Sequence, residues 1–488
     1  MADEKRGGGA GRLSSALAYP LLLCQNRNYL ALFMASVLQQ LGGWANLIAT
    51  LKVLEEGGGS VGVKTSLVFF MRNIPSVLIF PLAGYLADHY NKKVLLIASN
   101  LCAALVAASF VFARSLPLLC ALIFLKNACS NIYDPAKRSA VPLIVDKEKI
   151  AIAMTLDGVA WSSMLALGAA LGGLMTSQLG IVKCFLLDAV GFLLSCCCLV
   201  FLPNDLRVNG ANKDEVGRGG EAEGSSHASA LKGGDKSWTR TFAEECLAIF
   251  TEPSLRTPLL YTAMKASGGL IWGPADVLNL KFSQVDNFQI GHDQPLTLGI
   301  SYAFVGLGCF VGPLFSNLFL DTKREGALIK AVACGVGFLG AGYGTWALAA
   351  SFWMVETGNF LRAAASAVVW IKSTIVIQLF CDAKYLGRLF ALEIAWYTLA
   401  NSVSMFSVGV MVDQGLSKKH ICAGLTLLSL AVFVVWIAIN RMRRVGRERM
   451  DDQAYEMLVS ASGDDEGDDD DEEEGELGAE GVGGGHEV

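Results

Sequence analysis

Charge is scarce in this chain of 488 residues, since only 17% of them are Asp, Glu, Lys or Arg. A soluble protein of ordinary composition carries about 25% charged residues. Hydrophobic residues make up 53% of the sequence, and the mean hydropathy is +0.45. These values argue against a soluble multidomain protein and indicate a polytopic membrane protein.

Several functional signatures are also missing. The 13 cysteines are scattered through apolar runs without the paired spacing of metal ligands, so we interpret them as apolar filler and expect no metal. No phosphate-binding Gly-Lys-Ser/Thr loop occurs in the polar segments, so ATP is not the expected energy source, and no cofactor is expected. No nucleophile, base and orienting group recur at a plausible spacing, which argues against an enzyme. Residues 1–19 lack the apolar core of a cleaved secretory signal, so the first helix is expected to direct insertion.

Long apolar runs are what the sequence has in abundance. A helix needs about 20 apolar residues to cross the hydrocarbon of a bilayer. Twelve runs meet this length, and they cover residues 29–53, 63–86, 93–113, 116–137, 150–177, 181–202, 257–283, 296–320, 326–349, 352–378, 386–411 and 420–440. We therefore predict an all-α membrane protein with twelve transmembrane helices in two six-helix bundles, residues 29–202 and 257–440.

Three polar segments flank these bundles. Residues 1–28 form an N-terminal segment, and residues 203–256 form a linker too polar for a packed core. Residues 441–488 begin with a basic run, Arg441 to Arg449, and residues 451–488 hold 16 acidic residues with no Lys or Arg. We expect a disordered tail whose basic run binds anionic lipid, and we favour a solvating role for its acidic part over an intramolecular clamp.

Basic residues gather after the even-numbered runs. They are Lys92-Lys93, Lys137-Arg138, Lys323-Arg324, Lys384 with Arg388, and Arg441 to Arg449, whereas Lys418-Lys419 is an exception. Because cytoplasmic loops carry an excess of Lys and Arg, we expect both termini and the linker to be cytoplasmic. The sequence leaves open whether the membrane is the plasma membrane or an internal one.

The two predicted bundles also echo each other. Asp321, after the eighth run, matches Asp88, after the second, at an offset of 233 residues. Asp382-Ala383-Lys384 similarly echoes Asp134-Pro135-Ala136-Lys137, although Asp and Lys at helix ends also match by chance. The repeat predicts two halves related in parallel.

The loop from Gly84 to Lys93 resembles the loop between helices 2 and 3 of the major facilitator superfamily, Gly-x-Leu-x-Asp-x-x-Gly-Arg/Lys-Arg/Lys. Asn91 replaces a Gly, a mild departure because Asn tolerates a left-handed backbone. The resemblance implies alternating access, in which Asp88 faces the start of helix 386–411 near Arg388. By symmetry, Asp321 faces the start of helix 150–177. The alternative is a loop that only sets orientation. The gating candidates are Gly84, Asp88, Lys92, Lys93, Asp321, Lys323, Arg324 and Arg388.

Four further segments resemble exporters of this superfamily, and two of them resemble the enterobactin-exporter and macrolide-efflux branch in particular. Gly168-Ala169-Ala170-Leu171-Gly172-Gly173 is similar to the antiporter motif Gly-Pro-x-x-Gly-Gly, with Ala169 in place of Pro. Lys126 and Ser130 stand where proton antiporters have Arg and Gly. Tyr133 to Val145 and Gly387 to Leu392 also resemble this branch. Small residues still allow close helix packing, but the kink expected from Pro is lost.

The resemblance implies a central cavity surrounded by helices 1, 4, 7 and 10. Its candidate residues are Gln39, Gln40, Trp44, Asn46, Lys126, Asn127, Asn131, Lys265, Trp272, Asp276, Asn359 and Arg362. The spacing of Lys265, Trp272, Asp276 and Asn279 predicts one polar face; otherwise Lys265 snorkels to the surface. Lys126 and Arg362 suggest an anionic or carbonyl-rich substrate, unless both are neutralised internally, Arg362 by Glu356 for example. Glu356 itself fits the membrane interface as well as the cavity.

A proton-coupled carrier needs a carboxylate that titrates within the membrane. The candidates are Glu393, Asp276, Asp157 and Asp188, and we rank Glu393 and Asp276 first. We therefore expect a secondary transporter, monomeric in the lipid bilayer, that exports a small amphipathic organic molecule in exchange for protons and binds no nucleic acid. The alternatives are an uptake carrier or uniporter for an organic anion, and a transporter-like receptor or scaffold.

Overall fold

The computed structural model describes residues 20–79, 82–83, 86–87, 90–204, 206, 256–319, 325–381 and 386–463. Helices account for most of these residues. The chain divides into two units, residues 1–437 and 438–488, and each is treated by itself.

The first half of the larger unit consists of helices that follow the predicted apolar runs. They are α2 (Arg27–Glu56), α3 (Val61–Leu78), α5 (Lys92–Ser109), α6 (Leu116–Ile144), α7 (Ile150–Leu179) and α8 (Ile181–Val200). Asn26 caps α2, because its side chain accepts a hydrogen bond from the amide of Tyr29 at 2.9 Å. A 3₁₀ turn, Phe110–Phe112, extends α5.

The second half contains helices on the remaining runs. They are α12 (Arg256–Trp272), α13 (Ala275–Ser283), α14 (Gln294–Phe319), α15 (Glu325–Ala347), α16 (Phe352–Phe380), α17 (Leu386–Asp413) and α18 (Lys418–Gly463). Gly273-Pro274 separates α12 from α13, since the residue before a proline is disfavoured in a helix. The predicted run 257–283 is therefore two helices. The helix expected to end near Asn440 continues as α18 to Gly463.

Nine helices of the described residues are long and apolar enough to cross a membrane. They are α5 with its 3₁₀ turn, α6, α7, α8, α14, α15, α16, α17 and α18. This result confirms the all-helical membrane class. The break after Trp272 leaves α12 with 17 residues, so it falls short of the length of a span.

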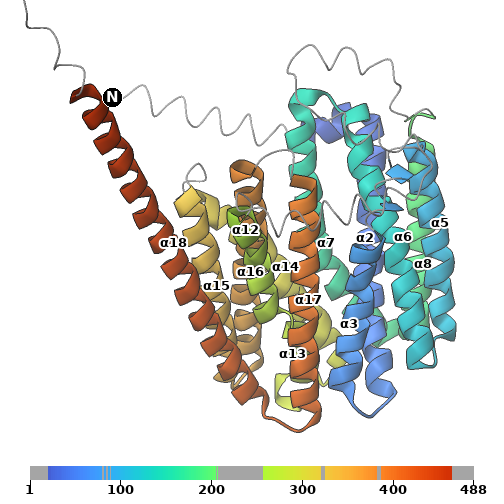
Figure 1. Ribbon diagram of the computed structural model, residues 1–488. Helices are drawn as coiled ribbons and strands as arrows, with labels where there is room; N and C mark the ends of the chain where they lie inside the picture. Colours follow the sequence, from blue (N-terminus) through green and yellow to red (C-terminus); the bar gives the residue numbers. More distant parts are fainter. Residues whose placement is uncertain are drawn as a thin grey trace, which may run out of the picture. The chain divides into compact units, whose positions relative to one another are not determined.

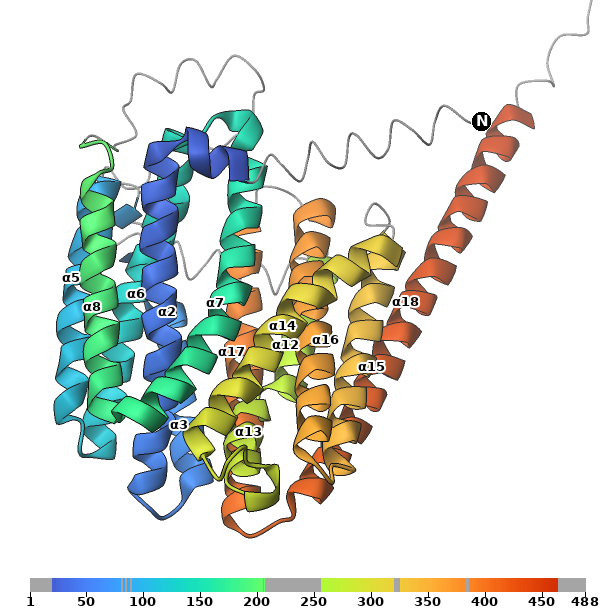
Figure 2. The same cartoon turned by 180° about the vertical axis from the view of Figure 1, so that it is seen from behind.

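The helices of the two halves meet through two principal pairs (Figure 1). Contacts between α3 and α17 form one pair, and contacts between α7 and α14 form the other. Figure 2 shows α7 crossing α14. One apolar cluster spans the two halves, because it joins Leu51 of α2 to Tyr302 of α14 and Met405 of α17. The residues of the candidate site belong to the helices of the two halves that these contacts hold together.

Candidate functional site

Asp413 joins the two halves at the start of α3. Its carboxylate accepts hydrogen bonds from the backbone amides of Gly62 and Val63, each at 2.9 Å. Ser60, the residue that precedes α3, supplies no side-chain cap. The first amides of a helix have no intrahelical acceptor, so an acidic residue of the opposite half caps this helix. Deeper in the contact, Ser66 donates a hydrogen bond to the carbonyl of Met405 at 2.9 Å.

Small residues bring α7 and α14 together. A Cβ added to Gly173 would lie 2.6 Å from the carbonyl oxygen of Pro295 and 2.9 Å from the Cα of Gly299. The Ser177 hydroxyl donates to the carboxylate of Asp293 across the same boundary. The segment from Gly168 to Gly173 thus allows the close packing expected of it, even though Ala169 replaces the proline.

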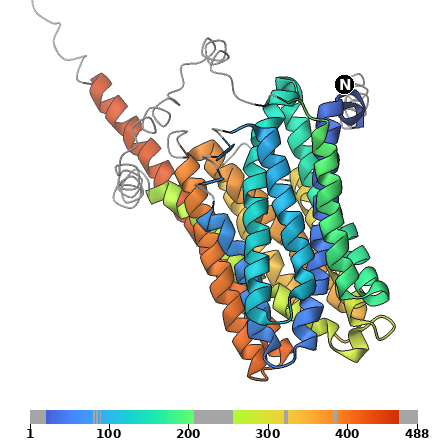
Figure 3. The ribbon, with the colours of Figure 1, turned by 90° about the vertical axis from the view of Figure 1, so that its right-hand side faces the viewer.

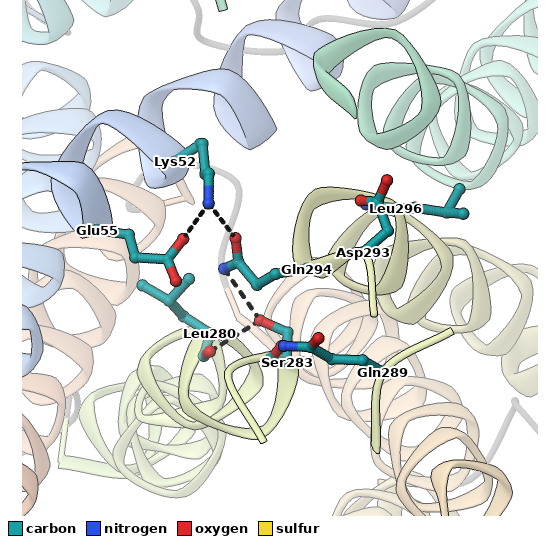
Figure 4. A network of polar contacts seen from close by, with 8 residues as sticks. All are labelled: Lys52, Glu55, Leu280, Ser283, Gln289, Asp293, Gln294 and Leu296. Carbon is teal, nitrogen blue, oxygen red and sulfur yellow. Dashed lines mark hydrogen bonds and ion pairs between the residues drawn. The ribbon is translucent and has the colours of Figure 1, made fainter. Parts of the chain in front are cut away.

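A polar network completes the contact between the halves (Figure 4). The ammonium of Lys52 pairs with Glu55 at 2.9 Å and reaches the side chain of Gln294, in the other half, at 3.4 Å. Gln294 in turn donates to the hydroxyl of Ser283 at 3.3 Å. Asp293, which receives the bond from Ser177, also caps α14 through the amide of Leu296.

These contacts gather at one end of the helices, which carries the α2–α3 loop (residues 57–60) and is called here the 57–60 end. In Figure 3 this blue loop and the orange turn after α17 lie at the same end. The hydrogen bonds described above between the two halves all lie at or toward this end. The 57–60 end is therefore closed.

The predicted gate at the opposite end is described only in part. Gly84, Asp88, Asp321, Lys323 and Arg324 lie outside the described residues. Arg388 lies in α17, but its side chain is likewise outside them.

Lys92 and Lys93 begin α5. Lys93 donates to the carbonyl oxygens of Val200 and Leu202 at 2.8 and 2.7 Å, so it caps the end of α8. Asn91 has an extended backbone, with φ −63° and ψ 122°, and caps α5. Tolerance of a left-handed backbone is therefore not why Asn fits this position.

Lys126 is neutralised within the first half. It forms an ion pair with Asp188 of α8, whose carboxylate is fully buried, and its ammonium also lies near the rings of Phe110 and Phe192. A second pair joins Lys137 to Asp157 at 2.7 Å. The alternative of internal neutralisation is thus confirmed for Lys126, because Asp188 provides its counter-charge.

The most deeply buried ion pair of the second half joins Lys265 of α12 to Glu393 of α17. The ammonium and the carboxylate are 2.9 Å apart, and the two side chains are 3% and 1% exposed. Thr374 accepts a hydrogen bond from Lys265 at 2.8 Å, and Ser373 donates one to Glu393 at 3.2 Å. The ring centre of Trp370 lies 4.2 Å from the Lys265 ammonium. Lys265 does not snorkel to the surface, since it is buried here.

Asp276 faces a different direction from Lys265. Its carboxylate accepts a hydrogen bond from the hydroxyl of Tyr302 in α14 at 2.7 Å, whereas Lys265 contacts α16 and α17. The prediction of one continuous polar face was wrong, because the break at Gly273-Pro274 separates the two residues. Trp272 packs against the rings of Trp370 and Tyr397, on the side of Lys265.

Glu356 is 1% exposed, so it does not lie at the membrane interface. It accepts hydrogen bonds from Ser301 at 2.6 Å and from Asn359 at 3.2 Å. Asn359 also accepts one from Arg362 at 3.2 Å. An amide therefore separates Glu356 from Arg362. The alternative of neutralisation by Glu356 thus holds without a direct ion pair, because the charge of Arg362 still acts on the Glu356 carboxylate.

The remaining cavity candidates are amides and one indole. Asn127 and Asn131 donate to carbonyls of their own helix, those of Ile123 and Asn127. Three others have buried polar atoms without a hydrogen-bond partner among the described residues: Gln40, Asn46 and Asn279. Gln39 is half-buried, and Trp44 packs edge-on against Trp161.

Arg72 of α3 is a basic residue that the sequence analysis missed. Its guanidinium lies 5.2 Å from the ring centre of Trp44, and its charge acts on the carboxylates of Asp276 and Asp188. It is a charged residue in the middle of the apolar run 63–86. Because a charge inside the bilayer is costly, its position alone marks it as a candidate functional residue.

Comparisons with known proteins agree with this architecture. The model of the Major Facilitator Superfamily matches residues 28–392. A relative in Bacillus subtilis (strain 168), the uncharacterized MFS-type transporter YfiS, is 22% identical over 91% of this chain and 98% of its own length. A homolog of the multi-drug resistance efflux pump PmrA in Lactococcus lactis is 29% identical, over 28% of this chain and 33% of its own. The crystal structure of the POT family transporter PepTSo matches 86% of this chain and 99% of its own, with a TM-score of 0.62 and 13% identity. This chain belongs to the major facilitator superfamily, and it is a multi-pass membrane transporter.

Proposed function

We propose that this transporter exports a small amphipathic organic molecule in exchange for protons. In this proposal twelve spans, with α12 and α13 together forming the seventh, alternate access around a cavity between the two halves. Both termini are cytoplasmic, as the basic loops predict, and the protein works as a monomer.

The pair of Lys265 and Glu393 is the observation that carries the proposal. A charged residue inside a bilayer costs about 2.5–3.5 kcal/mol on insertion scales, so its presence calls for a function. Glu393 is held by side chains from two further helices, and it accepts bonds from Lys265 and Ser373. A proton on Glu393 removes the attraction to Lys265 and loosens α12 from α17. This pair thus offers a direct link between protonation and helix movement.

The closed 57–60 end fits one step of the proposed export cycle. The charge rule is expected to place this end on the outer face, and an exporter takes up its substrate while its outer end is closed. The partial likeness to the PmrA homolog, whose name describes an efflux pump, also favours export.

A second candidate is an uptake carrier or uniporter for an organic anion. Arg362 and Arg72 favour it, because neither guanidinium forms an ion pair within the described residues. Two cationic groups suit an anion moved down its own gradient without a proton.

Membrane vesicles of opposite orientation separate the two candidates. Inside-out vesicles with an acidic interior are expected to accumulate amphipathic substrates, and the accumulation is expected to disappear when a protonophore removes the gradient. Equal uptake by vesicles of both orientations, unaffected by the protonophore, would favour the uniporter.

A further inference from the structure

The helices α12 and α17 pack side by side in register. Contacts one turn apart join them, and each joins residues that are 128 apart in the sequence: Lys265 with Glu393, Gly269 with Tyr397, and Gly273 with Asn401. The first contact is the buried ion pair. The other two are close approaches, because a Cβ on either glycine would lie 2.8 Å from a side-chain atom of α17. One face of α17 therefore follows α12 from the ion pair to the break at Gly273-Pro274.

This break leaves a backbone carbonyl without its helical partner. Proline has no N–H, so Pro274 cannot donate a hydrogen bond to the carbonyl of Leu270. The hydroxyl of Ser404 in α17 donates to this carbonyl instead, and Ser404 is 7% exposed. Tyr343 of α15 donates to the next carbonyl, that of Ile271, at 2.8 Å. Side chains of α15 and α17 thus hold the break in place.

On the far side of the break, α13 ends among the contacts between the two halves. Its last residue, Ser283, accepts a hydrogen bond from Gln294 at 3.3 Å, and Lys52 of the first half donates to Gln294 at 3.4 Å (Figure 4). Lys418 donates to the carbonyl of Lys281, two residues before Ser283, at 3.0 Å. A movement of α13 would therefore disturb the contacts that close the 57–60 end.

Glu393 and Ser404 lie on the same continuous helix. α17 runs from Leu386 to Asp413, and Ser404 follows Glu393 by about three turns. The ion pair and the hydrogen bond to the break are therefore two attachments of α12 to one helix. Loss of the first attachment leaves the second in place, so α12 changes its angle to α17 at the break.

We propose that Ser404 is a positioning residue that couples the Lys265–Glu393 pair to closure of the 57–60 end. It fixes the α12–α13 break to α17, so that a change at the ion pair alters the angle between α12 and α13 and draws Ser283 away from Gln294. This inference rests on the proposed proton coupling at Glu393, and it adds the route by which loss of the ion pair reaches the other end of the helices.

Electron paramagnetic resonance tests the coupling through the distance distribution between spin labels at residues 56 and 287. Both positions are exposed, the first at the end of α2 and the second in the turn after α13. The labels are attached through a non-natural amino acid, because the chain has 13 cysteines. Glu393→Gln removes the charge of the carboxylate and is expected to raise the open population about 5-fold or more. Combined with Ser404→Ala, it is expected to raise that population less than about 2-fold.

Two further variants separate this coupling from a general loss of stability. Ser407→Ala is the matched control, since Ser407 is exposed, lies one turn from Ser404 and donates to the carbonyl of Val403 in its own helix at 2.8 Å. In this background the response to Glu393→Gln should be complete. Ser404→Thr keeps the hydroxyl and should preserve most of the response. A Ser404 that only stabilised the fold would leave the response to Glu393→Gln equal in every background.

Two results would overturn the inference. One is that Glu393→Gln leaves the distance distribution unchanged, and the other is that it shifts the distribution equally with and without the Ser404 hydroxyl. Thermal unfolding in detergent identifies the folded variants, and Ser404→Cys, a weak donor of similar volume, gives the same test if Ser404→Ala is unstable. The distances are measured without substrate or gradient. A protein that shows the coupling but exchanges no protons therefore upholds this inference and fails the export proposal, whereas proton exchange without the coupling fails this inference alone.

Discussion

The Asp413 carboxylate at the end of α17 caps α3, a helix of the opposite half, through the amides of Gly62 and Val63. The 57–60 end cannot open without breaking these two bonds, and Ser60 does not replace them. Closure of this end is therefore coupled to the capping of a helix.

Asp413→Ala is expected to shift the protein toward a state in which the 57–60 end is open. Loss of a helix cap costs about 0.5–2 kcal/mol, which corresponds to a shift of roughly 2- to 30-fold in the equilibrium. The shift is measured by electron paramagnetic resonance, as the distance distribution between spin labels at residues 59 and 414. Asp286→Asn, a change of an exposed acid in the same half, serves as the control. Identical distance distributions for Asp413→Ala and the unmodified protein would refute a role in closure.

Gly173→Ala is expected to open the same end by another route. The added methyl group would lie 2.6 Å from the Pro295 carbonyl oxygen, so α7 and α14 must separate. The matched control is Gly158→Ala, since a Cβ at that position of α7 meets no atom within 4 Å. Labels on α7 and α14 should report a longer distance for the first variant alone. An equal response of the two variants would show that the close approach is unimportant.

The Lys265 and Glu393 pair is expected to show strong coupling in a double-mutant cycle. Lys265→Met alone leaves a buried carboxylate without its partner, and such a loss costs about 3–5 kcal/mol. The combination with Glu393→Gln removes both charges and should recover much of this loss. Thermal unfolding in detergent measures the stability of the three variants. If the stability losses of the two single variants simply add in the double variant, the two groups do not act as a pair in the folded protein.

Asp88→Asn tests the proposed gate at the opposite end. The variant is expected to reach the membrane in normal amounts but to transport more slowly, because the carboxylate would no longer attract the start of α17. Expression is measured on membranes and transport on the same preparation. Transport at the normal rate by a well-expressed variant would leave the loop with a topogenic role only.

The helices were predictable because apolar length alone determines where a chain can cross a bilayer. The dipeptide Gly273-Pro274 predicts the break in the seventh run. This break turns Asp276 away from Lys265. Helical spacing alone therefore gave the wrong face, since it assumes an unbroken helix.

The partners of the buried charges were harder to predict. Lys126 and Asp188 are 62 residues apart, and Lys265 and Glu393 are 128 apart, so no local pattern pairs them. Only the packing of α6 and α8 against α5, and of α12 against α17, determines which carboxylate meets which ammonium. The capping of α3 by Asp413, across 351 residues, is likewise a property of the closed fold.

Proton movement tests the central claim most directly. Purified protein in liposomes with an internal pH dye is given a panel of amphipathic anions and drugs, beside protein-free liposomes, Glu393→Gln and the exposed-site control Asp286→Asn. The account predicts proton flux opposite to substrate flux in the unmodified protein and in Asp286→Asn, and its loss in Glu393→Gln. Substrate flux without proton movement, or unchanged proton flux in Glu393→Gln, would contradict it.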